Sequence, residues 1–295
     1  MDSFAFTRRS ILGLLPAFAF SVASSASGLS EAAAGEELAA IERSIGGRLG
    51  VAAHDTGSGR RLTYRASELF AMCSTFKFLL AACILARVDD GKEDLKRRIS
   101  YEEKDLLEYA PVTRAHLQEG AMTVGDLCAA AVEQSDNTAA NLLLAWIGGP
   151  AGLTRFVRSL GNQITRLDRT EPELNSAVPG DPRDTTSPAA MLETMEKLLA
   201  GSTLSVLSRT QLTTWLEGNK TGMARLRAGV PANWRAGDKT GTGAHGALGD
   251  IGIFWSPQKP PILIAAYLME GNGSVGDRER AFASVGQLAA KAFSE

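Results

Sequence analysis

The sequence predicts an α/β protein, an α+β sandwich in which one antiparallel sheet is assembled from both ends of the chain and a helical lobe is inserted between them. The first observation is that strand-like runs lie near both ends, at residues 48–54, 61–64, 234–242, 248–256 and 261–269. The second is that the intervening pattern, from about residue 69 to 218, is helical. This order favours a sheet flanked by helices, with the inserted all-helical lobe packed against it and an active site in the seam.

The first elements follow from local patterns. Residues 31–45 have the amphipathic pattern of a helix, and the turn Asp55-Thr56-Gly57-Ser58-Gly59 joins the first two strands into a hairpin. The run 76–85 has helical length and almost no polar residue, which predicts a buried core helix.

Further apolar runs at 124–132 and 138–147 predict two more helices, and Gly148-Gly149-Pro150 ends the second of them. Residues 165–187 form a long polar loop that contains three prolines and a glycine. The chain closes with a helix from about 277 to 293.

Composition indicates an ordinary soluble globular protein. The chain has 295 residues, of which 44% are hydrophobic and 22% charged, and its net charge is −2. We therefore expect neither nucleic acid nor an anionic membrane as a partner. We expect one catalytic domain at 30–295, with a sheet lobe at about 30–68 and 219–295 and a helical lobe at about 69–218.

The first 26 residues have the pattern of an export signal peptide. Arg8-Arg9 precedes the apolar run 11–22, and small residues ending at Ala26 follow. Cleavage after Ala26 or after Ala34 fits equally well, and the signal is either of the twin-arginine type or a plain secretory one. This predicts a periplasmic or secreted bacterial protein with no stable membrane association once the leader is removed.

A serine and a lysine open the predicted core helix three residues apart. Ser74 and Lys77 share one face of the helix, so the amine can reach the hydroxyl. Burial disfavours a charged lysine and lowers its pKa, which gives a serine a neighbouring base. By itself this tetrad is a weak signal, because a capping serine beside an ordinary lysine produces the same pattern.

Three more polar clusters follow in order: Ser135-Asp136-Asn137, Glu171-Pro172-Glu173-Leu174-Asn175 and Lys239-Thr240-Gly241. With Ser74-x-x-Lys77, this set resembles the signature of class A serine β-lactamases, in the superfamily they share with penicillin-binding proteins. The resemblance covers about residues 30 to 293, essentially all of the chain after the leader.

The resemblance implies a catalytic role for five of these residues. Ser74 is the nucleophile, and its backbone N–H and that of Thr242 form the oxyanion hole. Lys77 takes or relays a proton, although Lys77 and Glu171 both remain open as the acylation base. Ser135 passes a proton to the departing ring nitrogen, and Glu171 with Asn175 directs a water at the acyl ester.

The resemblance also implies a substrate-binding set and a loop clamp. The binding residues are Tyr109, Asn137, Arg225, Lys239, Thr240, Gly241 and Thr242. Arg169 and Asp184 occupy the positions that pair across the neck of the loop, and the bond from Glu171 to Pro172 is expected to be cis. From local pattern alone, Ser135 also fits the N-cap of the next helix, with Asp136 in its first turn.

Other kinds of site are poorly supported by the sequence. The three histidines, His54, His116 and His245, have no metal-ligand spacing, so we expect no metal and no cofactor. The Gly-x-Gly-x-x-Gly run that starts at Gly241 precedes a strand rather than a helix. We expect no structural disulfide among Cys73, Cys83 and Cys128.

The sequence therefore predicts hydrolysis of the β-lactam ring of penicillins and cephalosporins through a serine acyl-enzyme, by a monomer that acts on small molecules. Two alternatives remain: a D,D-peptidase of cell-wall synthesis, and a β-lactam sensor domain that stays acylated. The loop with Glu171 and Asn175 argues against the peptidase. A sensor domain would normally be attached to a transmembrane signalling segment, and the sequence does not show one.

Overall fold

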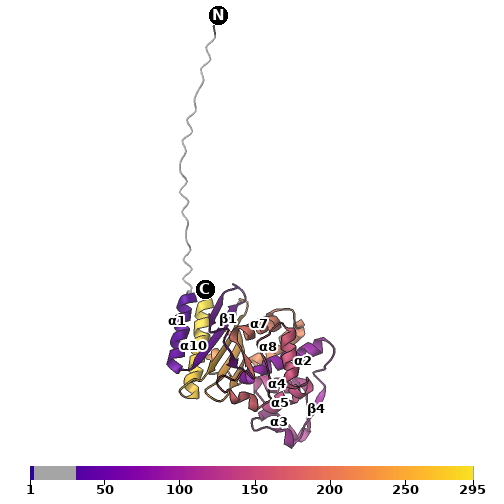
Figure 1. Cartoon of the computed structure of the whole chain (residues 1–295). Helices are drawn as coiled ribbons and strands as arrows, with labels where there is room; N and C mark the ends of the chain where they lie inside the picture. Colours follow the sequence, from indigo (N-terminus) through magenta and orange to yellow (C-terminus); the bar gives the residue numbers. More distant parts are fainter. Residues whose placement is uncertain (3–30, 295) are drawn as a thin grey trace.

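The computed structural model describes residues 1–2 and 31–294 of the chain (Figure 1). The predicted leader, 1–26, therefore lies almost entirely outside the described residues. Within those residues, no helix is long and apolar enough to cross a membrane.

The main sheet has five strands in the order β2-β1-β9-β8-β7, and every neighbouring pair is antiparallel. The strands are β1 (Arg48–Asp55), β2 (Arg61–Tyr64), β7 (Arg235–Thr242), β8 (Leu248–Trp255) and β9 (Ile262–Met269). The pairing of β1 with β9 joins the two ends of the chain, which confirms the predicted sheet. β9 is buried at all eight positions, as its uninterrupted apolar sequence indicates.

Two helices from opposite ends of the chain cover one face of this sheet. Figure 1 shows α1 (Glu31–Ile45, indigo) beside α10 (Val275–Phe293, yellow). Leu38 and Phe282 from these helices pack with Leu49 and Phe254 of the sheet into a core of their own.

The middle of the chain covers the other face. Its helices are α2 (Phe76–Asp89), α3 (Pro111–Ala115), α4 (Val124–Glu133), α5 (Asn137–Trp146), α6 (Gly149–Ser159), α7 (Pro188–Met195) and α8 (Val206–Glu217). The short helix α9 (Leu226–Gly229) instead packs against α10, and its Leu226 belongs to the core that α1 and α10 share. Helix α2 is buried from Phe76 to Leu85, as predicted. Each fully buried large apolar side chain contributes about 1.5–3 kcal/mol to folding, so α2 anchors the lobe.

The predicted all-helical lobe also contains strands, which is a correction to the sequence interpretation. β4 (Arg98–Ser100) pairs with β5 (Ala121–Thr123), and β3 (Phe70–Ala71) pairs with β6 (Thr185–Thr186). Strands of two or three residues are too short for an alternating pattern to show, and only their distant partners define them.

Candidate active site

A cavity of about 320 Å³ opens between the sheet edge and the helical lobe, in the seam where the sequence places the site. It is lined by Ser74, Tyr109, Ser135, Asn137, Asn175, Thr221, Arg225, Thr240, Gly241 and Thr242. Most of the residues selected from the sequence therefore meet in one place.

Ser74 lies in a single 3₁₀ turn, Cys73–Thr75, that runs directly into α2. Strand β7 approaches this turn closely because residue 241 is glycine. A Cβ at Gly241 would lie 2.7 Å from the Met72 carbonyl oxygen and 3.1 Å from the Ser74 backbone nitrogen. The missing side chain lets the backbone of β7 run beside Ser74.

Ser74 and Lys77 meet through a third residue, the carboxylate of Glu171. The Ser74 hydroxyl donates to Glu171 Oε1 over 3.1 Å, and Lys77 Nζ lies 2.9 Å from the same oxygen. The sequence predicts a direct contact between Lys77 and the Ser74 hydroxyl, and the structure instead brings a loop carboxylate to both groups. Lys77 Nζ also donates to the Ser135 carbonyl oxygen at 2.7 Å and to Asn137 Oδ1 at 2.6 Å.

The side chain of Lys77 is fully buried. Burial lowers the pKa of Lys77 below its ordinary value, while the charge and hydrogen bond of Glu171 oppose that change. Less free energy is therefore needed to deprotonate Lys77 than to deprotonate a lysine on the surface.

Asp136, rather than Ser135, is the N-cap of α5, which corrects the local interpretation of this motif. The Asp136 carboxylate accepts the Ala139 N–H at 2.9 Å and also the N–H groups of Val112 and Thr113 at the start of α3. One fully buried carboxylate thus joins two helix starts. Ser135 is left in a turn with a φ of 56°, outside the helix.

The Ser135 hydroxyl lies between two lysines. Lys239 Nζ donates to Ser135 Oγ at 3.1 Å, and Lys77 Nζ does so at 3.3 Å. Lys239 is fully buried on β7, and burial, followed by the nearby charge of Lys77, lowers its pKa well below 10.5. Ser135 Oγ therefore connects Lys77 of α2 with Lys239 of the sheet edge.

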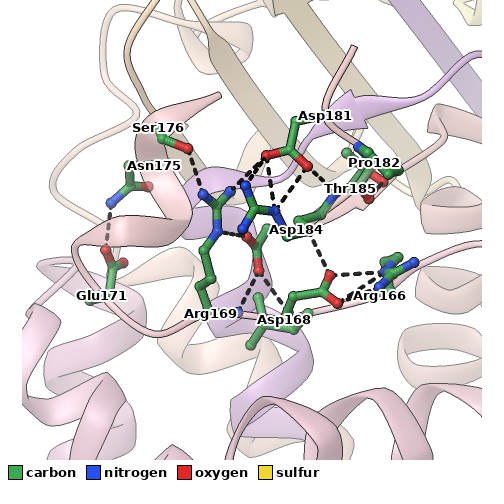
Figure 2. Close-up of polar contacts among 12 residues, drawn as sticks. Arg166, Asp168, Arg169, Glu171, Asn175, Ser176, Asp181, Pro182, Asp184 and Thr185 are labelled. Carbon is green, nitrogen blue, oxygen red and sulfur yellow. Dashed lines mark hydrogen bonds and ion pairs between the residues drawn. The ribbon is translucent and has the colours of Figure 1, made fainter. Parts of the chain in front are cut away.

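Glu171 is held by contacts on both its carboxylate and its backbone. Asn175 Nδ2 donates to Glu171 Oε2 at 2.5 Å (Figure 2), and the predicted cis peptide bond before Pro172 is confirmed. The Asn141 side chain accepts the Glu171 N–H at 3.0 Å and donates to the Glu171 carbonyl oxygen at 2.8 Å. Only 2% of Glu171 is exposed, so this acid is fixed inside the site.

The neck of the loop is closed by the predicted pair. Arg169 Nε donates to Asp184 Oδ2 at 2.6 Å, and Asp184 Oδ1 accepts the N–H groups of Asp168 and Arg169 (Figure 2). Arg169 also donates to the Ser176 hydroxyl at 2.9 Å. These bonds tie both ends of the loop together and to the 3₁₀ helix Glu173–Ser176, which contains Asn175.

Comparison with known proteins agrees with this geometry. The model of the β-lactamase enzyme family matches residues 33–293. The chain belongs to this family. It is 45% identical to β-lactamase CTX-M-8 of Citrobacter amalonaticus over 86% of this chain and 87% of that protein. It is 44% identical to β-lactamase Toho-1 of Escherichia coli over 88% of each.

Solved structures place the chain among the class A enzymes of the family. An ancestral class A β-lactamase matches with a TM-score of 0.87 and 58% identity, over 88% of this chain and all of that one. The class A β-lactamase of the last common ancestor of Gram-negative bacteria matches with the same TM-score and 59% identity, over 88% and 99%. The chain is thus a class A serine β-lactamase, a hydrolase, as the sequence predicts.

The far wall of this β-lactamase site contains a buried arginine. Arg225 is 4% exposed and donates from Nη1 to the carbonyl oxygens of Gly241 and Gly249, and from Nη2 to Thr242 Oγ1 at 2.8 Å. Tyr109, which is 51% exposed, stands at the mouth of the cavity.

Sequence reasoning missed two residues of the site. Asn141, which holds the Glu171 backbone, is the one strongly polar residue in the apolar run 138–147, and that isolation could have identified it. Thr221 belongs to the segment between α8 and α9 and lines the cavity. No local sequence pattern distinguishes it.

The remaining polar candidates lie in ordinary surroundings. Among the described residues, no group of three or more His, Cys, Asp or Glu side chains could hold a metal ion. His54 pairs with Glu196, and His116 pairs with Glu119. The three cysteines are buried free thiols.

Proposed function

We propose that this β-lactamase opens the ring of penicillins and cephalosporins through an acyl-enzyme on Ser74, which is released by a water that Glu171 activates. Such an activity confers resistance to these antibiotics. The observation that carries the proposal is that Ser74, Lys77 and Asn175 all direct hydrogen-bond donors at the carboxylate of Glu171. One buried acid therefore contacts the nucleophile, its neighbouring base and the amide that helps hold a water.

In acylation, Ser74 Oγ attacks the ring carbonyl carbon, and the ring C–N bond then breaks. The hydroxyl proton moves to Glu171, which already accepts its hydrogen bond, or to a neutral Lys77. Ser135, within reach of both lysines, returns a proton to the ring nitrogen. The backbone N–H groups of Ser74 and Thr242 stabilise the oxyanion, and losing one such donor typically costs about 10²–10³ in rate.

In deacylation, Glu171 removes a proton from water as the water attacks the ester carbonyl carbon. The bond from that carbon to Ser74 Oγ then breaks, and Ser74 Oγ takes a proton back from Glu171, which is within hydrogen-bond distance. Asn175 supports this step because its Oδ1 is buried and has no hydrogen-bond partner among the described residues, so it can accept a bond from that water. General-base assistance is worth about 10²–10⁴-fold, which separates an enzyme that turns over from one that remains acylated.

Substrate binding uses the opposite wall of the cavity. Lys239 and Arg225 supply positive charge for the carboxylate of the substrate, with hydroxyl groups from Thr240 and Thr242. Asn137 binds the side-chain amide of the substrate, Gly241 leaves room for the substrate along β7, and Tyr109 borders the entrance. No metal or cofactor takes part in these steps.

We further propose that residues 1–26 are an export signal and that 30–295 act as one monomeric catalytic domain in the periplasm or outside the cell. The Arg8-Arg9 motif and the following apolar run support export. The family match, which begins at residue 33, supports the domain boundary.

The test is turnover of a chromogenic cephalosporin, measured beside the Glu171→Gln variant and read by intact-protein mass. We expect many turnovers by the wild type and a covalent adduct on Ser74 in the variant. Glu173→Gln, in an exposed neighbour on the same loop, is the matched control and should turn over normally. A wild type that stops after one equivalent would support the penicillin-binding or sensor alternative.

A further inference from the structure

Two threonine hydroxyls in the wall of the cavity are hydrogen-bonded to each other. Thr221 comes from the segment between α8 and α9, Thr240 comes from β7, and their Oγ atoms are 2.5 Å apart. Each hydroxyl has a single hydrogen, so only one of them donates in this bond.

The neighbouring amide determines which one donates. The backbone N–H of Thr221 donates to Asn219 Oδ1 at 2.9 Å, and a backbone N–H is always a donor, so this end of the amide is the oxygen. At the other end, Asn219 Nδ2 donates to Asp238 Oδ2 at 2.9 Å. Both ends of the Asn219 side chain therefore agree on its orientation.

The hydroxyl of Thr221 lies 2.8 Å from the same Asn219 Oδ1, to which it must donate its hydrogen. Thr221 Oγ then offers only lone pairs to Thr240. The Thr240 hydroxyl therefore donates to Thr221, and its hydrogen is directed at a protein atom rather than into the cavity.

Thr242, two residues further along the same face of β7, has the opposite arrangement. Its Oγ1 accepts a hydrogen bond from Arg225 Nη2 at 2.8 Å, and a guanidinium has no acceptor to offer in return. The hydroxyl hydrogen of Thr242 is thus free to point at a ligand. The two hydroxyl groups differ in where their hydrogens point, because Thr240 faces an acceptor, Thr221 Oγ1, and Thr242 faces a donor, Arg225 Nη2.

We propose that Thr221 is a positioning residue that sets the direction of the Thr240 hydroxyl and thereby weakens the binding of anionic substrates. This inference rests on the proposed function, in which Thr240 donates to the substrate carboxylate. To do so, Thr240 must give up its bond to the neutral Thr221 oxygen. Residue 221 therefore tunes affinity for the carboxylate without touching Ser74 or Glu171.

The test compares Thr221→Val with the wild type on benzylpenicillin and on its methyl ester, which lacks the anionic carboxylate. Valine has the shape of threonine but no acceptor. A net hydrogen bond of ordinary strength corresponds to about 3- to 10-fold in affinity. The ratio to be compared is kcat/KM for benzylpenicillin divided by kcat/KM for its methyl ester. We expect this ratio to rise by that factor in Thr221→Val, because KM for benzylpenicillin falls while kcat stays unchanged.

Thr221→Ser restores the acceptor and should return the ratio to that of the wild type, and a melting temperature measured for each variant shows that it is folded. An unchanged or smaller ratio in a folded Thr221→Val variant overturns the inference. Absence of turnover in the wild type would instead refute the proposed function, so the two failures are distinguishable.

Discussion

The hydroxyl of Ser74 donates a 3.1 Å hydrogen bond to the carboxylate of Glu171, which lies 97 positions later in the chain. The first group belongs to the buried start of the central helix, and the second to a loop closed at its neck by Arg169 and Asp184. The position of the Glu171 carboxylate therefore depends on how firmly that loop is closed.

Replacement of Arg169 by serine should loosen the loop. Asp184 would lose its charged partner and keep only two backbone donors, which we expect to lower the free energy of unfolding by about 1–3 kcal/mol. We also expect slower deacylation and a relative gain for cephalosporins with bulky side chains. Thermal melts and kinetics on paired small and bulky substrates measure both effects.

Arg183→Ser is the matched control for that change. Arg183 is 52% exposed and pairs with Asp181 at the surface, so its loss should alter stability by less than about 0.5 kcal/mol. Unchanged kinetics in Arg169→Ser would show that the neck does not position Glu171.

An alanine at position 243 should disturb the same loop from the sheet side. A Cβ on Gly243 would lie 2.7 Å from Cys73 Sγ and 2.8 Å from the Asn175 carbonyl oxygen, both closer than real Cβ atoms approach. Either the turn after β7 or one of these neighbours must move, so we expect a lower melting temperature and a changed rate of acyl-enzyme release. Intact-protein mass spectra of samples quenched at successive times measure that rate.

The control for Gly243→Ala is Gly35→Ala in helix α1, where an added Cβ meets nothing within 4 Å. That change should stabilise the protein by about 0.5–1 kcal/mol, because alanine favours a helix more than glycine does. A Gly243→Ala variant with wild-type stability and kinetics would contradict the close approach of Gly243 to the loop.

The alkaline limb of the pH profile of kcat/KM should reflect the deprotonation of Lys239. Burial lowers its pKa well below 10.5, and only the protonated amine attracts the carboxylate of the substrate. As pH rises through this lowered pKa the charge is lost, so kcat/KM should fall at a pH below 10.5. In Lys239→Arg the guanidinium stays charged, and the alkaline limb should move to higher pH even if maximal activity drops. Identical limbs in the two proteins would assign the limb to another group.

The three cysteines should behave as unreactive free thiols. Burial raises the pKa of Cys73 to about 12 and that of Cys83 to about 11, and it raises the pKa of Cys128 as well. Thiolates are the reactive form, so a thiol reagent at neutral pH should react slowly with the native protein and label three groups after unfolding. A mass increase of two hydrogens on reduction would instead reveal a disulfide.

Local sequence patterns were enough to predict the large elements of the fold and the residues of the motifs. The apolar run of α2 predicts a buried helix whichever partners surround it, and the strand patterns at both ends require one shared sheet. Elements that depend on distant partners were not predictable in this way. Strands β3 and β6 pair two residues each across more than a hundred positions.

By itself, the sequence determined the family and the antiparallel sheet from both termini, because the order and spacing of chemical groups along the chain carry that information. It also selected Ser74, Lys77, Glu171 and Lys239 as candidate site residues. The tertiary structure alone decided which atoms meet: that Ser74 and Lys77 share Glu171 Oε1, that Asp136 accepts hydrogen bonds from the starts of two helices, and that Thr221 faces Thr240. The physical reason is that a hydrogen bond depends on distances and donor directions of about an ångström, which only packing of remote segments sets.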